Sequence, residues 1–354
     1  MNLNPNAVLR ALRASGKKHL FITGSRGSGK TKLFDALTEG LSCGIRSRKE
    51  GNTVTMTGFQ RQGKFIIGTK LQEENCMTPI TEAIETRGVA LLENCIGSSE
   101  QTVAIDEIGY LECGSPLYQT TLTALLDKKN VLSCVRKDKH DFLSEILARS
   151  DAFVVDLDEP VSGLSCIVLA SGASRRFGSN KLLAPLGEKP VIAHTLEKVS
   201  ELSPLFEKSI VATRYDEIAT LSEIYRLCFV LHDLPSKSDT VRIAVEAIGV
   251  ASGYLFLQSD QPLLTKETIT ALALAWQNDK GSIWRLACHD VATTPVIFPG
   301  KFFSALRALT GDSGGSPIIK QNEAIVRFLE ANAESEVLDL DEPSDLERIQ
   351  AVSC

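Results

Sequence analysis

The sequence predicts an α/β protein of two domains, each a mainly parallel sheet with flanking helices. A short apolar run, a glycine-rich loop with basic residues and an amphipathic stretch follow one another twice, beginning at His19 and at Cys166. After each segment, strand-like runs alternate with helix-like stretches, which indicates βαβ units. The chain has 354 residues, whereas single cores stop growing at roughly 250–300. A turn-rich stretch, DEPVSG, divides the chain, so we predict domains at residues 1–160 and 163–354.

Composition excludes several classes of protein. With 43% hydrophobic residues the chain can bury two cores, so wholesale disorder is excluded. The net charge of −6 argues against a nucleic-acid or membrane-surface partner. Nine scattered cysteines without a C-x-x-C pair indicate neither a zinc site nor a disulfide framework. The chain shows neither a signal-peptide pattern nor a membrane-length apolar run, so we expect a cytoplasmic protein.

Apolar runs bounded by turn residues predict the strands. In the first domain these are His19–Thr23, Thr102–Ile105, Asn130–Val135 and Ala152–Leu157, with a hairpin at Thr53–Met56 and Phe65–Gly68. In the second they are Cys166–Ala170, Ser209–Thr213, Phe229–Leu231, Tyr254–Gln258, Pro295–Phe298 and Val337–Leu340.

The first glycine-rich loop, GSRGSGKT, fits the phosphate-binding pattern G-x-x-x-x-G-K-[ST]. Gly24, Gly27 and Gly29 let the backbone curl so that its N–H groups face a phosphate. Lys30 would reach the β and γ oxygens, and the Thr31 hydroxyl would bind Mg²⁺. A helix over Thr31–Leu41 completes the unit, which would take ATP or GTP.

Two acids follow the apolar strand that begins at Thr102. Asp106 at the strand end would hold Mg²⁺ through water, and Glu107 would polarise an attacking water. The alternative is that both acids merely cap a helix.

These motifs resemble the nucleoside-triphosphatase family with the DEIG signature. Asp106–Gly109, Glu112 and the segment Val135–Phe142 match it, and the resemblance covers residues 17–157. It implies a P-loop NTPase fold and Mg²⁺-dependent hydrolysis of an NTP or phosphoryl transfer. The loop departs from the family by having Ser25 and Arg26 where a proline-rich opening is usual. A competing analogy is molybdopterin-guanine dinucleotide protein B.

The second loop, LASGASRRFGSNK, suits activation of an NTP. Its backbone would wrap the triphosphate at Ala170, Ser171, Gly172 and Gly178. Arg176 and Lys181 would neutralise charge as the α-phosphate is attacked.

A second hydrophobic strand delivers Asp260 at its carboxyl end, the position where α/β sheets bind ligands. This carboxylate would hold Mg²⁺ between the α-phosphate and the acceptor. The alternative for Asp260 is a turn or capping role. Separately, the region 339–347 has the spacing of a helix cap, and the alternative there is a metal role for Asp341.

Residues 165–349 resemble the MobA/MocA-like molybdenum cofactor nucleotidyltransferases, a Rossmann-like NTP-transferase fold. The match rests on Leu169–Ile192, Ser259–Leu264, Gly311–Gly314 and Leu338–Leu346. Within it, Asn180–Leu183 resembles the cytidylyltransferase branch. The resemblance implies transfer of CMP from CTP (or of GMP from GTP) to molybdopterin with release of pyrophosphate, and an apo-molybdoenzyme as a candidate client.

Three segments depart from that family. Ala292–Val296 lacks the usual glycine and arginine, Gly315-Ser316 stands where an arginine is usual after Gly311-Asp312, and Ser236–Thr240 replaces a glycine-rich loop. These residues would touch acceptor and base. Two alternatives therefore stay open: a sugar or polyol phosphate as acceptor, and a cofactor chaperone that binds without turnover.

Overall fold

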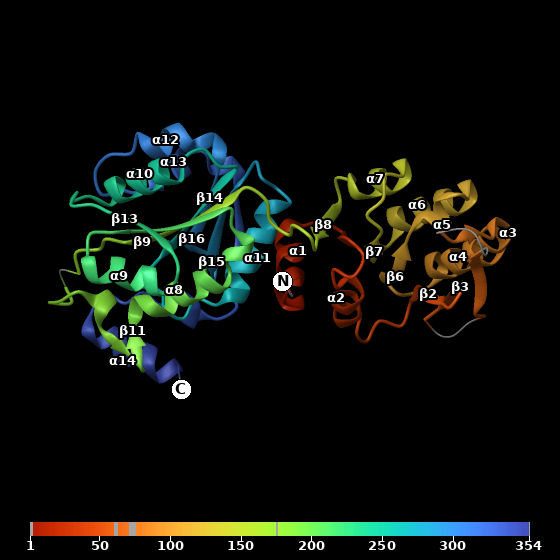
Figure 1. Ribbon diagram of the computed structural model, residues 1–354, viewed down its shortest axis with the longest axis horizontal. Coiled ribbons are helices and arrows are strands. Elements are labelled where there is room, and N and C mark those ends of the chain that lie inside the picture. Colours follow the sequence, from red (N-terminus) through yellow and green to blue (C-terminus); the bar gives the residue numbers. More distant parts are fainter. Residues whose placement is uncertain (1–2, 60–62, 71–75, 175, 354) are drawn as a thin grey trace. The chain divides into compact units, whose positions relative to one another are not determined.

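The computed structural model describes residues 3–59, 63–70, 76–174 and 176–353 (Figure 1). Contacts group the chain into two compact units, one of Met1–Pro5 with Ser15–Glu159 and one of Asn6–Ala14 with Pro160–Cys354. The second unit thus includes most of the first helix, for which the amino-acid pattern gave no indication.

The sheet of the first unit has eight strands in the order β5-β4-β3-β2-β6-β7-β1-β8. The strands are β1 (His19–Thr23), β2 (Gly44–Glu50), β3 (Thr53–Gly58), β4 (Phe65–Thr69), β5 (Thr78–Pro79), β6 (Thr102–Ile108), β7 (Asn130–Val135) and β8 (Ala152–Asp156). From β2 to β8 across the sheet all pairings are parallel, and β3, β4 and β5 extend it antiparallel. The carboxyl ends of β1 and β6 therefore share one edge, which places the phosphate loop and the acids after β6 there.

Helices cover this sheet. They are α2 (Lys30–Leu37), α3 (Thr81–Ala83), the π-helix η1 (Ile84–Gly88), α4 (Val89–Gly97), α5 (Tyr110–Cys113), α6 (Pro116–Lys128) and α7 (Asp141–Leu147). The core between sheet and helices includes fully buried Phe21, Leu92, Tyr118 and Leu122. Such close packing of apolar side chains is what holds the strand ends in place.

The second unit has a seven-stranded sheet in the order β13-β12-β9-β14-β16-β15-β17. Its strands are β9 (Leu164–Ala170), β12 (Lys208–Thr213), β13 (Cys228–Leu231), β14 (Gly253–Gln258), β15 (Ile283–Cys288), β16 (Val291–Pro299) and β17 (Val326–Glu330). β10 (Pro185–Leu186) and β11 (Lys189–Pro190) pair separately. The chain leaves β9 toward β12 and later returns to β9's other side as β14, which makes a topological switch point between β9 and β14.

Helices lie on both faces of this sheet, with α10, α12 and α13 on one and α8, α9 and α11 on the other (Figure 1). They are α8 (Val191–Glu201), α9 (Asp216–Ile224), α10 (Lys237–Ile248), α11 (Lys266–Gln277), α12 (Phe303–Arg307), α13 (Ser316–Gln321) and α14 (Pro343–Ser353), with short 3-10 turns η2 (Lys181–Leu183), η3 (Ser203–Leu205), η4 (Gly300–Phe302), η5 (Glu323–Ile325) and η6 (Glu334–Val337).

The first helix, α1 (Pro5–Ser15), is anchored within the second unit. Ala7, Val8 and Ala11 on one of its faces are fully buried. Arg10 Nη1 donates to Thr268 Oγ1 at 2.7 Å, and Arg10 Nη2 donates to the carbonyl of Glu330 at 2.8 Å. The P-loop unit is therefore inserted, along the chain, between α1 and the rest of the second unit.

The predicted α/β fold class is confirmed, as is the hairpin, whose strands β3 and β4 pair antiparallel. One predicted strand, Val337–Leu340, is wrong. Val337 is the last residue of a 3-10 turn, and the residues after it form no strand. Only Leu340 N bonds across, to Asp260 O at 2.9 Å, so no ladder forms. Strands β2, β15 and β17 were missed because charged or polar residues interrupt their apolar pattern. The predicted helix after the phosphate loop ends at Leu37 rather than Leu41, since Gly40 takes a φ of 83°.

Candidate active sites

The phosphate loop joins β1 to α2. Gly24, Gly27 and Gly29 have φ values of 142°, 84° and 100°, a region that side chains avoid. Gly24 is also hemmed in, because an added Cβ would lie 2.7 Å from Ser28 Oγ. Lys30 Nζ donates to the carbonyls of Gly24 and Ser25 at 2.8 and 2.9 Å, so the lysine folds over its own loop. The predicted glycines thus shape the loop around the amino end of α2, which begins at Lys30; Thr31 follows in its first turn and is exposed.

Asp106 and Glu107 lie near the end of β6, at the edge that carries the loop. Burial raises the pKa of Asp106, and the guanidinium of Arg48, 2.9 Å away, opposes that rise. Burial also raises the pKa of Glu107, while the charges of Arg136 and Lys30 lower it. The charge of Lys30 therefore acts on Glu107, although the two residues lie 77 positions apart in the sequence. A carboxylate near a phosphate-binding lysine can orient a water for attack on an NTP.

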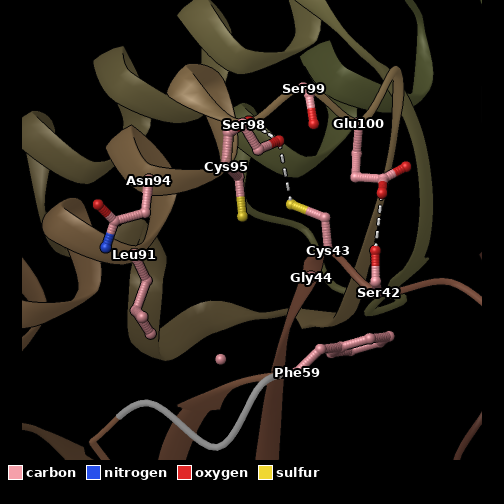
Figure 2. Close-up of a pocket in the computed structure, with 11 residues that line it drawn as sticks. Ser42, Cys43, Gly44, Phe59, Leu91, Asn94, Cys95, Ser98, Ser99 and Glu100 are labelled. Carbon is pink, nitrogen blue, oxygen red and sulfur yellow. Dashed lines mark hydrogen bonds between the residues drawn. The ribbon is translucent and has the colours of Figure 1, made fainter.

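A cavity of the first unit lies away from the phosphate loop. It has a volume of about 380 Å³ and forms between the start of β2 and the end of α4 (Figure 2). Parallel strands place the start of β2 at the edge opposite the phosphate loop. Burial and the neighbouring thiol of Cys43 raise the pKa of Cys95 to about 12, so this thiol stays protonated. The lining residues that the structure describes include no lysine or arginine.

In the second unit, hydrogen bonds hold the loop after β9. Ser171 Oγ lies 2.8 Å from His232 Nε2, and Tyr215 donates its hydroxyl hydrogen to Gly172 O at 2.8 Å. Ser259 Oγ donates to Leu169 O at 2.7 Å, which ties the ends of β9 and β14 together at the switch point. Ala170 closes β9, and Gly178 turns the loop with a φ of 80°. Arg175, within the loop motif, lies outside the described residues.

Lys181 is the centre of this site. Its Nζ donates to Asp260 Oδ2 at 2.8 Å and to Asp341 Oδ1 at 3.0 Å, and the residue is only 7% exposed. Burial opposes the positive charge, but the two carboxylates outweigh burial and raise the pKa of Lys181. The lysine is therefore a permanent cation at neutral pH.

Arg176 extends this cluster toward solvent. Its Nη2 donates to Asp341 Oδ2 at 2.7 Å, with the arginine side chain 67% exposed. The hydrogen bond from Lys181 holds the pKa of Asp341 below its usual value. Behind them, burial and then the charge of Asp260 raise the pKa of Asp339, whose carboxylate accepts a hydrogen bond from Gln261. Two cations and three carboxylates thus gather where β9 and β14 end.

The carboxylates fit a divalent cation. Asp260 and Asp341 both reach the same ammonium group, so hard oxygen donors from two segments face one point. Mg²⁺ is commonly bound by one or two carboxylates together with substrate phosphates. Among the described residues, no group of three or more His, Cys, Asp or Glu side chains forms a metal centre by itself. The arrangement suits a cation that arrives with a nucleotide.

The structure brings together some predicted site residues and leaves others apart. Lys181, Asp260 and Arg176 meet through Asp341, whose role the sequence left open between a metal site and a cap. In the cap, Asp345 accepts hydrogen bonds from the backbone of Asp341 and Glu342. The partner of Asp106, Arg48, was missed because it lies in a strand that the pattern did not reveal.

Family models match both halves of the chain. A family model described as MobA-like NTP transferase domain matches residues 166–326, and one described as NTPase matches residues 19–161. The purine catabolism protein PucB of Bacillus subtilis (strain 168) is 30% identical over 199 residues, covering 52% of this chain and 94% of that protein.

Two solved structures are similar to the transferase half. The Mycobacterium tuberculosis rv0371c homologue from Mycobacterium sp. strain JC1 is 28% identical, with a TM-score of 0.48, and the match covers 54% of this chain and 97% of the other. A nucleotidyl transferase from Methanothermobacter is 22% identical, with a TM-score of 0.45, and covers 53% and 96%. In the described residues no helix has the length and apolar character needed to cross a membrane. The chain belongs to the MobA-like NTP transferase family and carries an NTPase domain ahead of its transferase domain.

Proposed function

We propose that the second domain transfers CMP from CTP to molybdopterin, in its metal-free or molybdenum form, and releases pyrophosphate. The observation that supports this proposal is the buried Lys181, whose ammonium group donates hydrogen bonds to both Asp260 and Asp341. This cluster lies at the switch point, beside a glycine-rich loop. A cation fixed by two carboxylates is preorganised to meet the charge that develops on a triphosphate under attack.

In this reaction an oxygen of the acceptor phosphate forms a bond to the α-phosphorus. The bond from that phosphorus to the oxygen bridging it to the β-phosphate breaks, and pyrophosphate leaves with the electron pair. Lys181 stabilises the charge on the transferred phosphate, and Arg176 binds the leaving pyrophosphate. No covalent intermediate with the protein is needed because the acceptor phosphate is itself the nucleophile.

Asp260 and Asp341 would hold Mg²⁺ at this site, where it supplies Lewis-acid polarisation of phosphate oxygens. The backbone at Ala170, Ser171, Gly172 and Gly178 binds the triphosphate. Support for CTP over GTP is the resemblance of Asn180–Leu183 to the cytidylyltransferase branch. In this chain the side chain of Asn180 accepts a hydrogen bond from Leu182 N and so sets the short turn that presents Lys181.

The first domain, in the same proposal, binds and hydrolyses ATP or GTP with Mg²⁺. Lys30 binds the phosphates, Thr31 and Asp106 hold the metal, and Glu107 orients the attacking water. Its role beside the transferase would be to drive handover of the finished cofactor or to bind an apo-molybdoenzyme client.

Pyrophosphate release tests the transferase. The full chain would be supplied with CTP, GTP, ATP or UTP and with molybdopterin, a sugar phosphate or a polyol phosphate. We expect turnover with CTP and molybdopterin. Turnover only with a sugar or polyol phosphate would show that the acceptor is not molybdopterin. Equal turnover with all four nucleotides would show that the site does not select CTP.

Asp260→Asn separates catalysis from a chaperone role. The variant keeps the size of the side chain and removes the carboxylate, so we expect pyrophosphate release and cofactor delivery to a client hydroxylase to be lost together. Delivery that survives while release is lost would show that binding without turnover is the function.

A further inference from the structure

The second unit contains a small cavity that the proposed reaction has not used. It has a volume of about 100 Å³ and lies between the sheet and the helices α10, α12 and α13. Leu169, which lines it, directly precedes the nucleotide loop, and Gln258 on its wall stands two positions before Asp260. The cavity therefore opens at the same sheet edge as the Lys181 cluster.

The three segments that depart from the family all reach this cavity. Lys237 comes from Ser236–Thr240 and Thr294 from Ala292–Val296, and Gly315 and Ser316 are the third departing segment. These residues lie far apart in the sequence. Lys237 begins α10, Thr294 lies in the middle of β16, and Gly315 directly precedes α13. The three differences from the family therefore all lie around this one cavity.

Arg285, on β15, is the charged group inside the cavity. Its Nη2 has a long hydrogen bond of 3.4 Å to Thr293 O, while its Nε is buried without a protein partner. Among the described residues that line the cavity there is no aspartate or glutamate, and burial lowers the pKa of this guanidinium. A half-buried arginine with no carboxylate beside it leaves a donor group unsatisfied unless a ligand accepts from it.

Position 315 has no room for a side chain unless Phe298 shifts. A Cβ added to Gly315 would lie 2.7 Å from Cζ of Phe298, which is buried in the core. In this chain Gly315 and Ser316 stand where the family usually supplies a cation after Gly311-Asp312, and Arg285 provides a guanidinium in the same cavity from another strand. Lys237, whose side chain lies near Gly314 and is exposed at the rim, adds a second positive charge.

The walls define what the cavity accepts. Phe256 and Phe298 supply aromatic surface, packed edge to face, and Val296 adds aliphatic surface. The cavity is small, so it suits the terminal ring of an acceptor rather than a whole acceptor. An apolar slot with an unsatisfied N–H donor fits a flat heterocycle that carries carbonyl or ring-nitrogen acceptors.

We propose that Arg285 binds the heterocyclic end of the acceptor, remote from its attacking phosphate, and that Lys237 closes the rim over it. The proposal rests on the proposed function and names the part of the acceptor that sets specificity. Arg285 is a specificity-determining residue in this scheme, since the nucleotide and the reacting phosphate are bound by other groups.

A binding comparison tests the proposal without turnover. The probes are a pterin with a phosphorylated side chain and glycerol 3-phosphate, which carries the same phosphate and no ring. We expect the full chain to bind the pterin phosphate at least tenfold more tightly, and Arg285→Gln to remove most of that difference. Affinity for glycerol 3-phosphate and for CTP should change less than threefold.

Arg242→Gln is the matched control, because Arg242 lies on α10 and pairs with Asp239 outside the cavity. Lys237→Ala is a second test variant, chosen because Lys237 is exposed at the rim and its loss should not disturb folding. We expect it to weaken pterin phosphate binding several-fold. Equal binding of both probes by the native chain, or a ring preference that survives both substitutions, would overturn the proposal.

The two proposals fail in different ways. If the native chain releases no pyrophosphate with any phosphorylated acceptor but Arg285 still governs ring binding, the catalytic assignment is wrong and the ring pocket stands. If pyrophosphate is released and the Arg285 variant keeps its KM for the acceptor, the pocket assignment is wrong and the transferase stands.

Discussion

Replacement of Lys181 by methionine is the most informative change at the transferase site. The substitution keeps the length and the apolar part of the side chain, and it removes the charge that lies 2.8 Å from Asp260 and 3.0 Å from Asp341. Both carboxylates then face each other and the incoming triphosphate without a neutralising cation.

The expected loss follows from the geometry. A unit charge pair at about 3 Å has a gross interaction of roughly 5–6 kcal/mol at an effective dielectric constant of about 20. Water reaches both carboxylates, so the net contribution of the ion pairs to folding is much smaller, about 1 kcal/mol. The cost to catalysis is larger, because a preorganised charge at the reacting centre is typically worth about 10²–10³ in kcat. We expect kcat to fall by that factor and the midpoint of unfolding to change little.

The pH profile adds a readout that a merely structural role would not move. Lys181 holds the pKa of Asp341 below its usual value in the native chain. Without the lysine that pKa rises, so the acid limb of the kcat/KM profile should shift to higher pH. Lys181→Arg should recover part of the rate at neutral pH.

Pyrophosphate release with CTP and acceptor is the assay. Lys266→Met is the control, because Lys266 pairs with Glu201 in the same unit and the substitution changes the net charge equally. A Lys181→Met variant that is folded and retains kcat/KM within threefold of the native value, with an unmoved acid limb, would refute the electrostatic role of this lysine.

Three further predictions concern other parts of the chain. Lys30→Met should lower NTP hydrolysis by about 10²–10³ and leave pyrophosphate release intact, as phosphate and pyrophosphate assays would show; loss of both would mean that the two activities are coupled. Arg10→Ala should destabilise the second unit by about 1–2 kcal/mol in denaturant unfolding, and Arg13→Ala on the exposed side of α1 should not; equal effects would contradict the anchoring of α1. Burial raises the pKa of Glu112 to about 7, so the folded state binds a proton that the unfolded state has lost, and the free energy of unfolding should fall as pH rises from about 4.5 to 7. Glu112→Gln should flatten that slope in unfolding measurements between pH 5 and 8; an unchanged slope would rule out Glu112 as its source.

Local patterns were enough to predict the loops and the acids at the strand ends. A phosphate loop needs glycines at particular steps, and a buried strand needs an uninterrupted apolar run, so both appear within a dozen residues. For that reason Lys30, Asp106, Lys181 and Asp260 could be selected from the sequence, and β7 was predicted with its observed bounds.

Strands with mixed patterns could not be predicted in this way. β2 contains Arg46 and Arg48, and its burial falls from buried to exposed along its length. Its place in the sheet depends on pairing with β3 and β6 rather than on its own residues, which is why the partner of Asp106 was missed.

The amino-acid sequence by itself determined that this chain has two nucleotide-binding α/β domains, because the motifs that say so are short and local. Only the tertiary structure decided which acids share Lys181, that α1 belongs with the transferase unit, and that three divergent segments meet Arg285 in one cavity. The contacts of Lys181 and of Arg10 join residues 79 to 320 positions apart. Neither spacing nor composition shows which distant side chains a folded sheet brings to the same edge.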